Sequence, residues 1–365
     1  MSFALRSLLA LSAALGLAAF LPEGSQEKVE AGQPPMASGY RVLEPISQGR
    51  LAIFPVVTSA VHDTRQFLTL DEGLTSGEVV VTEAGSIRPL IRRPGQRLAP
   101  QQDAEVNRLV LVNNSSRPLL LLAGEIVTGG KQDRVVGRDR IIPPNSDPVD
   151  LSVFCVEPGR WVARSTNFGG MEAQMAQPSV RAKAMGDKDQ GKVWEEVRKS
   201  NDSRLANAPA SVRAEVGSSS SYAVVAGNRE IKKQVDEVAG ALLTSHDRVL
   251  RELRAQNAVG VVVAVNGRII WADLFASTSL LEKYWEKLVR SYAAEALNTY
   301  GGHGSTGVKQ AQAFLDDWEG NRQVVETEPG VFRHTEISGS GYRAFELTSL
   351  LPKAGFDVHL SKMVE

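Results

Sequence analysis

Charged and polar side chains gather in one stretch of the chain, residues 124–161, beside long apolar runs. Glu125 follows the run LLLLAG and Glu157 follows VFCV, so each carboxylate lies near the end of an expected strand. A carboxylate that is buried there needs a cationic partner, because an unpaired buried charge is strongly unfavourable. The cations of the same stretch that could serve are Lys131, Arg134 and Arg160.

This mixture of charges permits two interpretations. In the first, a carboxylate acts as a general base, and the cations bind a phosphate or carboxylate group of a ligand. In the second, the same groups form ion pairs that fix the strand ends, which is the commoner role of such residues. The candidate catalytic residues are Glu125 and Glu157, and the candidate ligand-binding residues are Lys131, Gln132, Arg134, Arg160 and Trp161.

The glycines before Lys131 resemble a phosphate-binding loop at first sight. A P-loop needs four residues between its first glycine and its Gly-Lys pair, and a Ser or Thr after the lysine. Here an extra glycine intrudes and Gln132 follows Lys131, so triphosphate hydrolysis by a P-loop is excluded. Two interpretations remain: a turn whose backbone N–H groups face an anion, or a hairpin with positive φ at Gly129 or Gly130.

The other reactive side chains give weaker indications. Cys155 is the only cysteine, so the chain can form no intramolecular disulfide, and its apolar neighbours favour a buried structural thiol over a nucleophile. The five histidines are scattered without metal-binding spacing. We therefore expect no cofactor and no histidine-based metal site, and a calcium or magnesium site made of carboxylates alone is left open.

The first residues have the pattern of a signal peptide. Arg6 precedes an apolar run over residues 8–21 that is short for a membrane span, and a polar stretch follows. We expect residues 1–31 to be a leader that exports the protein to the periplasm or the cell exterior. An uncleaved membrane anchor and a buried N-terminal helix are the alternatives.

The charge balance limits the partners. A formal net charge of −1 provides no field that would attract nucleic acids or anionic membranes. No nucleic-acid partner is expected, and membrane contact is expected only through an uncleaved N-terminal segment. The partners that remain are a small anionic ligand or another protein.

Strand-like runs follow one another from Tyr40 to about Glu157. They are short, rich in Val, Ile and Leu, and separated by Gly, Pro, Asn and Ser, which is typical of an antiparallel sandwich or barrel. The pattern predicts a β-rich region over residues 32–165. The runs are YRVLEPI, LAIFPVVTSA, FLTLDEGL, GEVVVTEA, RLVLVNN, LLLLAGEIVTG, RVVGRDRIIPP and VDLSVFCVE.

Residues 166–365 show a mixed pattern. Asn266-Gly267 between two strand-like runs predicts a β-hairpin, and a wide apolar stripe after Ser277 predicts a long helix to about residue 300. The fold class is therefore α+β, a β-rich N-terminal half followed by mixed helices and a hairpin, packed as one globular unit. Further expectations are helices at 190–205, 229–243 and 308–318, a mobile loop at 167–186, a loop at 208–221, and C-terminal strands in VFRHTEI and YRAFELTSL.

Several motifs resemble a known family. They are GE-x(4)-GKQ-x-R over residues 124–134, CVE-x-GRW over residues 155–161, Gln190 with Val193-Trp194, and NG with ADLF in the expected hairpin. The resemblance is to the ARPP family, the ADP-ribosylglycohydrolase and rhodanese-phosphatase-superfamily-associated protein domain, from about Tyr40 to at least Tyr292. It implies association with enzymes that process ADP-ribosylated or phosphorylated substrates, and it assigns no catalytic residue.

Three hypotheses for the function follow. The first is an exported protein that binds a small anionic or glycosidic ligand at the Glu/Lys/Arg cluster. The second is a hydrolase that acts on an ADP-ribose-like or phosphorylated substrate, with Glu125 or Glu157 as general base. The third is an interaction protein in which the cluster is a structural ion-pair network.

Overall fold

The computed structural model describes residues 39–83, 108–159, 164–299, 301 and 304–365, which all belong to one compact unit. The expected leader, residues 1–31, lies outside these described residues, and so do Arg160 and Trp161. Helices and strands occupy similar shares of the described chain, which confirms the α+β class. No helix in this part of the chain is long and apolar enough to cross a membrane.

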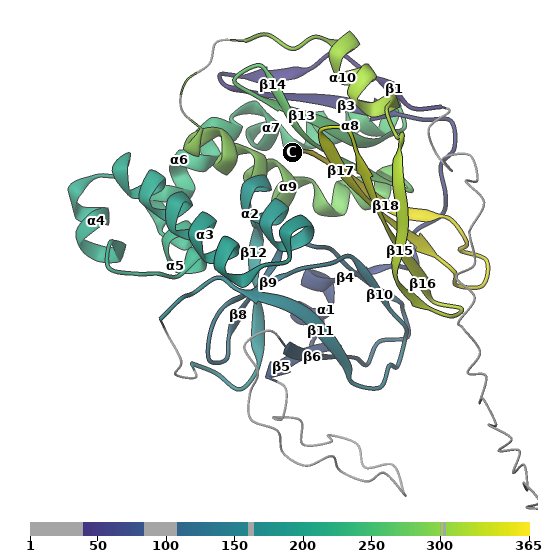
Figure 1. Cartoon of the computed structure of the whole chain (residues 1–365), viewed down its shortest axis with the longest axis horizontal. Helices are drawn as coiled ribbons and strands as arrows, with labels where there is room; N and C mark the ends of the chain where they lie inside the picture. Colours follow the sequence, from purple (N-terminus) through teal and green to yellow (C-terminus); the bar gives the residue numbers. More distant parts are fainter. Residues whose placement is uncertain (1–38, 84–107, 160–163, 300, 302–303) are drawn as a thin grey trace, which may run out of the picture. The chain divides into compact units, whose positions relative to one another are not determined.

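A six-stranded antiparallel sheet that nearly closes on itself dominates the N-terminal half (Figure 1). A bridge between Thr82 and Asn167 connects the two outer strands of this barrel, and apolar side chains fill its interior. This confirms the β-rich, barrel-like N-terminal half. In spatial order the strands are β12 (Phe168–Met175), β8 (Glu125–Gly129), β9 (Arg134–Val136), β11 (Val149–Cys155), β6 (Arg108–Asn113) and β5 (Val79–Glu83).

A three-stranded sheet and a short helix accompany this barrel. The helix, α1 (Leu70–Ser76), corrects the expectation of a strand over FLTLDEGL, because Thr69 and Glu72 form a capping box that starts a helix. The backbone N–H of Thr69 lies 2.8 Å from Glu72 Oε2, and that of Glu72 lies 3.3 Å from Thr69 Oγ1. The strands are β10 (Arg140–Ile142), β7 (Leu119–Leu121) and β4 (Leu68–Thr69).

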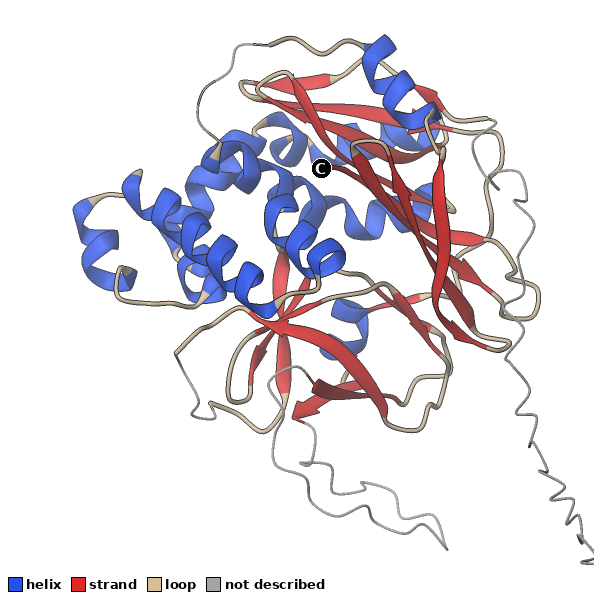
Figure 2. Cartoon of the chain, viewed as in Figure 1, coloured by secondary structure: helices blue, strands red, loops and turns tan. Residues whose placement is uncertain are grey.

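A nine-stranded sheet (Figure 2) combines segments far apart in the sequence, as the colours of Figure 1 show. Its strand β3 (Leu51–Val57) pairs antiparallel with β13 (Ala258–Val265). The predicted hairpin is confirmed, since β13 pairs with β14 (Arg268–Phe275) across Asn266 and Gly267, both with positive φ. The other strands are β1 (Arg41–Val42), β2 (Ile46–Gln48), β15 (Gly320–Glu328), β16 (Phe332–Gly339), β17 (Tyr342–Ser349) and β18 (Asp357–Val364).

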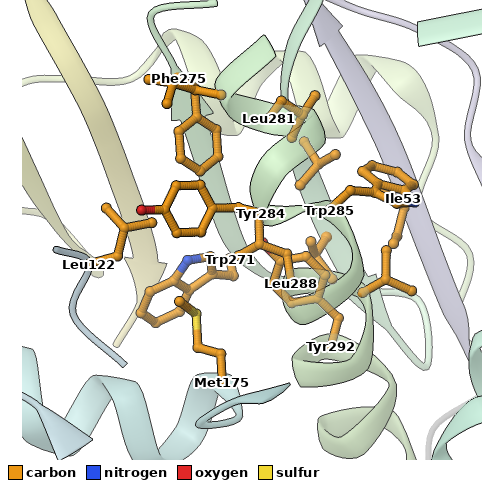
Figure 3. Close-up of a cluster of buried hydrophobic side chains, with 14 of the residues drawn as sticks. Ile53, Leu122, Met175, Trp271, Phe275, Leu281, Tyr284, Trp285, Leu288 and Tyr292 are labelled. Atoms are coloured by element: carbon orange, nitrogen blue, oxygen red, sulfur yellow. The ribbon is translucent and has the colours of Figure 1, made fainter. Parts of the chain in front are cut away.

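Helix α9 (Thr278–Asn298) lies in the largest hydrophobic cluster (Figure 3). Its N-terminus is capped by Ser277, whose Oγ accepts a hydrogen bond of 3.1 Å from the backbone N–H of Leu280. Tyr284 stacks on Phe275 of β14 with ring centroids 5.5 Å apart. Because apolar residues cover most sides of α9, the helix is buried between the large sheet and the barrel strand β12.

Two segments that were expected to be loops contain regular secondary structure. Residues 167–186, expected to be a mobile loop, contain β12, α2 and part of a π-helix, because β12 pairs with β8 and Pro178 occupies the first turn of α2. Residues 208–221, expected to be a loop, contain α4. The helices are α2 (Pro178–Ala182), η1 (Lys183–Asp187), α3 (Gln190–Ala206), α4 (Ala210–Val216), α5 (Tyr222–Gly227), α6 (Arg229–Ala239), α7 (Ala241–Thr244), α8 (His246–Ala255) and α10 (Val308–Asp316).

Substitution of Gly260 in β13 tests how closely the strands of the large sheet pack. A Cβ atom there would lie 2.4 Å from the backbone oxygen of Asp273 and 2.7 Å from the Cα of Leu274. Because backbone atoms of a paired strand cannot move aside, we expect Gly260→Ala to lower the free energy of unfolding by about 1–3 kcal/mol in urea titrations. Gly169→Ala in β12 is the matched control, since its Cβ would meet nothing within 4 Å. Equal stability of the two variants would contradict this packing.

Candidate functional site

The structure separates the two candidate catalytic carboxylates. Strands β8 and β11 both pair antiparallel with β9, so they run parallel to each other. Glu125 begins β8, whereas Glu157 comes just after the end of β11. The two carboxylates therefore lie at opposite ends of the barrel strands and do not form one cluster.

Glu125 belongs to a triad with Lys287, which is also buried, and Asp71, whose side chain is 38% exposed. Lys287 Nζ lies 2.8 Å from Glu125 Oε1 and 2.7 Å from Asp71 Oδ2, and the backbone N–H of Leu122 donates to Glu125 Oε2 at 2.9 Å. Burial raises the pKa of Glu125, and attraction to Lys287 offsets only part of that effect. Lys287, from α9, compensates the charge that Lys131, Arg134 or Arg160 was expected to compensate.

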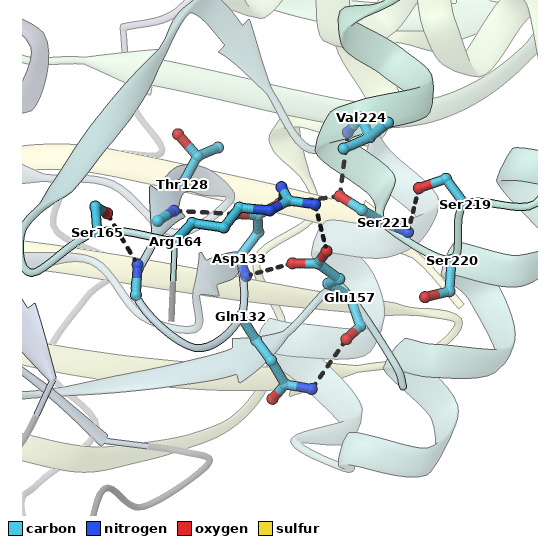
Figure 4. Close-up of polar contacts among 12 residues, drawn as sticks. Thr128, Gln132, Asp133, Glu157, Arg164, Ser165, Ser219, Ser220, Ser221 and Val224 are labelled. Carbon is cyan, nitrogen blue, oxygen red and sulfur yellow. Dashed lines mark hydrogen bonds and ion pairs between the residues drawn. The ribbon is translucent and has the colours of Figure 1, made fainter. Parts of the chain in front are cut away.

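Glu157 belongs to a second cluster, around the turn between β8 and β9 (Figure 4). Its Oε2 accepts a hydrogen bond of 3.1 Å from the backbone N–H of Asp133, and its Oε1 lies 3.2 Å from Nη2 of Arg164. Gln132 Nε2 donates to the backbone oxygen of Glu157 at 2.9 Å. Asp133 itself accepts a hydrogen bond of 2.9 Å from the hydroxyl of Ser221, which also caps α5.

Arg134 is fully buried and lies beside this second cluster. Its Nη1 donates to the backbone oxygen of Gln132 at 2.6 Å. The structure thus brings Gln132, Arg134 and Glu157 together, with Asp133 and Arg164 as members that the sequence analysis did not name. Apart from Arg164, whose side chain is half exposed, these groups are buried and bond to one another, as in a structural network.

The backbone N–H groups of the Gly-rich turn donate hydrogen bonds to side chains of the same chain. Gly129 donates to Asp133 Oδ1 at 3.0 Å, Gly130 to Ser165 Oγ at 3.2 Å, and the backbone of Lys131 to Glu83 Oε1 at 2.7 Å. The φ angles of Gly129 and Gly130 are 132° and 48°, as the hairpin interpretation requires. The anions that face the turn are side chains of the chain itself.

Cys155 is a buried thiol. Its Sγ accepts a hydrogen bond of 3.4 Å from the backbone N–H of Glu157. Burial raises the pKa of this thiol, so the nucleophilic thiolate is disfavoured at neutral pH. The geometry suits a structural cysteine.

A third polar cluster, which we call the buried ionic network, consists of Asp139, Arg181, Asp273, Tyr292 and His359. Arg181 forms two bonds to Asp273, of 2.8 and 3.0 Å, and the hydroxyl of Tyr292 donates to the same carboxylate. His359 Nδ1 lies 2.6 Å from Asp139 Oδ2, and its Nε2 lies 3.3 Å from Asp273 Oδ1. The four charged side chains have no solvent exposure.

The pKa values of His359 and Asp273 indicate that both side chains are charged at neutral pH. Burial alone would lower the pKa of His359, but attraction to Asp139 and Asp273 raises it to about 9. Burial alone would raise the pKa of Asp273, but Arg181 and His359 hold it well below its usual range. At neutral pH His359 is therefore a cation and no general base, and the network stabilises the fold.

An open cleft lies where the barrel meets β15, and we call it the arginine cleft. Its volume is about 340 Å³, within the range of ligand sites. Arg138 Nη1 and Arg140 Nη2 lie 2.8 and 3.0 Å from the two carboxylate oxygens of Glu326. Arg108 Nη2 lies 2.5 Å from Asp150 Oδ2. The walls also include Leu121, Val136, Leu151 and Ser152.

Metal binding has no support in the described part of the chain. Its His, Cys, Asp and Glu side chains form no group of three or more that could hold a metal ion. The arginine cleft, with three guanidinium groups, suits an anion instead.

The fold and these clusters define an α+β protein in which a barrel-like sheet and a nine-stranded sheet are joined by buried ion pairs. The chain belongs to the family of the ARG and Rhodanese-Phosphatase-superfamily-associated Protein domain, whose sequence profile matches residues 39–363. This confirms the resemblance found in the motifs. No curated protein and no solved structure matches the chain significantly.

Several of the polar residues described above left only weak traces in the sequence. Asp133 stands inside the KQDR motif, and Arg138, Asp139 and Arg140 form an alternating charge pattern within a strand-like run. Lys287 interrupts the apolar stripe of α9 one turn after Tyr284. A lysine inside such a stripe is the kind of residue that needs a buried anion. Nothing local indicates that Glu125 is this anion.

His359 should make the stability of the protein depend on pH. Its pKa is about 9 in the folded state against 6.5 without the network, so its stabilising effect is complete below pH 6.5 and lost as the pH rises towards 9. Between pH 6.5 and 8 we expect the urea midpoint to fall in the wild type and to change less in His359→Gln. Above pH 8 Lys362, whose pKa is lowered to about 8, acts in the opposite direction.

His62→Gln is the matched control for this pH series, since His62 lies outside the network, stacked on Phe356. It should keep the wild-type slope. A His359→Gln slope equal to that of the wild type would show that the charge of His359 does not stabilise the fold.

Glu125→Gln tests whether the Lys287 triad is structural. The variant leaves Lys287 buried with Asp71 alone, and loss of one partner of a buried pair costs about 3–5 kcal/mol. We expect a loss of this order in urea unfolding. Glu282→Gln removes the partner of the more exposed Arg254 and should cost less than about 1 kcal/mol. A Glu125→Gln variant as stable as wild type would show that the ion pair of Glu125 with Lys287 contributes little to the fold.

Proposed function

We propose that this protein binds a small anionic ligand, through a phosphate or carboxylate group, in the arginine cleft. The observation that supports the proposal is the convergence of Arg108, Arg138 and Arg140 on one cleft of about 340 Å³. Among the described residues that line it, only Asp150 and Glu326 carry negative charge. The guanidinium groups thus outnumber the carboxylates.

The arrangement of Arg138 and Arg140 suits a bidentate anion. Each arginine gives one bond to Glu326, so this carboxylate occupies the place that a ligand carboxylate or phosphate would take. The side chains of the two arginines are only 25% and 21% exposed, so water screens them less than a surface pair. Glu326 comes from β15, an edge strand of the large sheet, and an incoming anion would compete with it.

The two arginines are also held in position. Asp139, between them in the sequence, points away from the cleft, where it accepts bonds from His359 and, at 2.7 Å, from the backbone N–H of Ala123. Arg140 Nη1 donates to the backbone oxygen of Asp150 at 2.6 Å, and its guanidinium lies 5.7 Å from the centre of the Phe332 ring. A preorganised pair of this kind loses little entropy when it binds.

Glu125 and Glu157 act as structural anions in this proposal, since each is buried with cationic and N–H partners. The family's name motivates ADP-ribose and sugar phosphates as the first ligands to test, together with inorganic phosphate. The location of this binding outside the cytoplasm rests on the leader-like residues 1–31 alone and stays a prediction.

The test is calorimetric titration of the wild type and three variants with ADP-ribose, a sugar phosphate and inorganic phosphate. Arg140→Gln removes a charge-assisted bond worth about 1.5–3 kcal/mol, so we expect affinity to fall at least about 10-fold. Glu326→Gln removes the competing carboxylate and should increase affinity. The two variants are thus expected to change the affinity in opposite directions, which is specific to a ligand bound in the arginine cleft.

Arg254→Gln is the control, because Arg254 forms an exposed pair with Glu282 outside the cleft. It should bind as the wild type does. Equal affinity of Arg140→Gln and wild type, or weaker binding by Glu326→Gln, would contradict the proposal. Thermal unfolding of each variant identifies any loss that comes from misfolding.

A further inference from the structure

Arg204, near the end of α3, is a buried cation whose bonding is incomplete. Its side chain is 1% exposed. One nitrogen, Nη2, donates to Gln177 Oε1 at 2.8 Å and to the hydroxyl of Tyr222 at 2.7 Å. The other two nitrogens, Nε and Nη1, have no hydrogen-bond partner among the described residues.

No described carboxylate lies within ion-pair distance of Arg204. Glu295, the acid that shares Gln177 with it, accepts instead from Gln177 Nε2 at 3.1 Å and from the backbone N–H of Ser179 at 2.9 Å. The guanidinium also packs on the ring of Tyr222, with Cζ 4.3 Å from the ring centre. A ring face and two neutral oxygens do not neutralise a buried charge, which needs a counterion.

Arg204 lines a small cavity that is rich in cations. The cavity has a volume of about 20 Å³, enough for one water molecule or one ion of similar size. Lys232 of α6 and Arg290 of α9 also line it, and none of its described lining residues is acidic. Arg290 is compensated by Asp236, at 2.7 Å, and by Glu286. Arg204 and Lys232 have no such described carboxylate.

We propose that a monovalent anion of the size of chloride binds in this cavity, held by Nε and Nη1 of Arg204 with Lys232 as second cation. A water molecule would satisfy the hydrogen bonds of the guanidinium, but it would leave the charge unbalanced. A phosphate or a sugar phosphate is too large for the space. This site is separate from the arginine cleft, with which it shares no lining residue.

The test replaces gluconate by chloride at constant ionic strength and follows thermal unfolding of the full chain. An ion that binds only the folded state raises the melting temperature saturably, by about 2 °C at ten times its Kd for a chain of this size. We expect this rise in the wild type and in Arg140→Gln, and its loss in Arg204→Met. Lys199→Met, an exposed lysine of the same helix, is the control and should keep the rise.

Bromide anomalous diffraction from crystals of the wild type provides a second measurement, which stands even if Arg204→Met does not fold. A peak within bonding distance of Nε or Nη1 of Arg204 supports the proposal. A water molecule at that place, identical melting in chloride and gluconate, or an undiminished rise in Arg204→Met would overturn it. Since Arg140→Gln affects only the arginine cleft, failure of one site is distinguishable from failure of the other.

Discussion

The pairing of Arg181 with Asp273 and of His359 with Asp139 is the constraint on which the arrangement of this protein depends. Each of these charges would be strongly unfavourable alone, and together two cations balance two anions. They come from α2, β14, β18 and the segment between β9 and β10, so the barrel and the large sheet must meet for any of them to be neutralised. Gly124 permits this approach, since a Cβ there would lie 2.7 Å from the Arg181 side chain.

The same segment connects stability with the proposed function. Asp139 faces the buried network, while its neighbours Arg138 and Arg140 face the arginine cleft. Bonds that fix the backbone at Asp139 therefore also fix the two guanidinium groups. A ligand that displaces Glu326 would release β15 from the barrel, because Glu326 contributes both ion pairs that join them at this place.

Much of the fold could be predicted from the sequence because it depends on local patterns. Asn266-Gly267 specified its hairpin, and the stripe after Ser277 specified α9. The capping box of Thr69 and Glu72 lies inside an apolar run that favours a strand, and the helices after Gly170 are short and depend on tertiary contacts. The residue types around Glu125 and Glu157 predict one polar cluster. Its division into two clusters depends on strand direction, and the pairing of Glu125 with Lys287 spans 162 positions, which no local pattern reveals.

The position of β3 has a consequence for the order of folding. This strand, LAIFPVV, is buried beside β13, from which some 200 residues of chain separate it. During synthesis from the N-terminus, β3 emerges long before its partner and remains an apolar strand with an unpaired edge. Contacts of such high sequence separation slow folding and leave intermediates prone to aggregation. The barrel can close early, whereas the large sheet is completed only when the last strand, β18, has been synthesised. A chaperone that shields β3 would act between these two events.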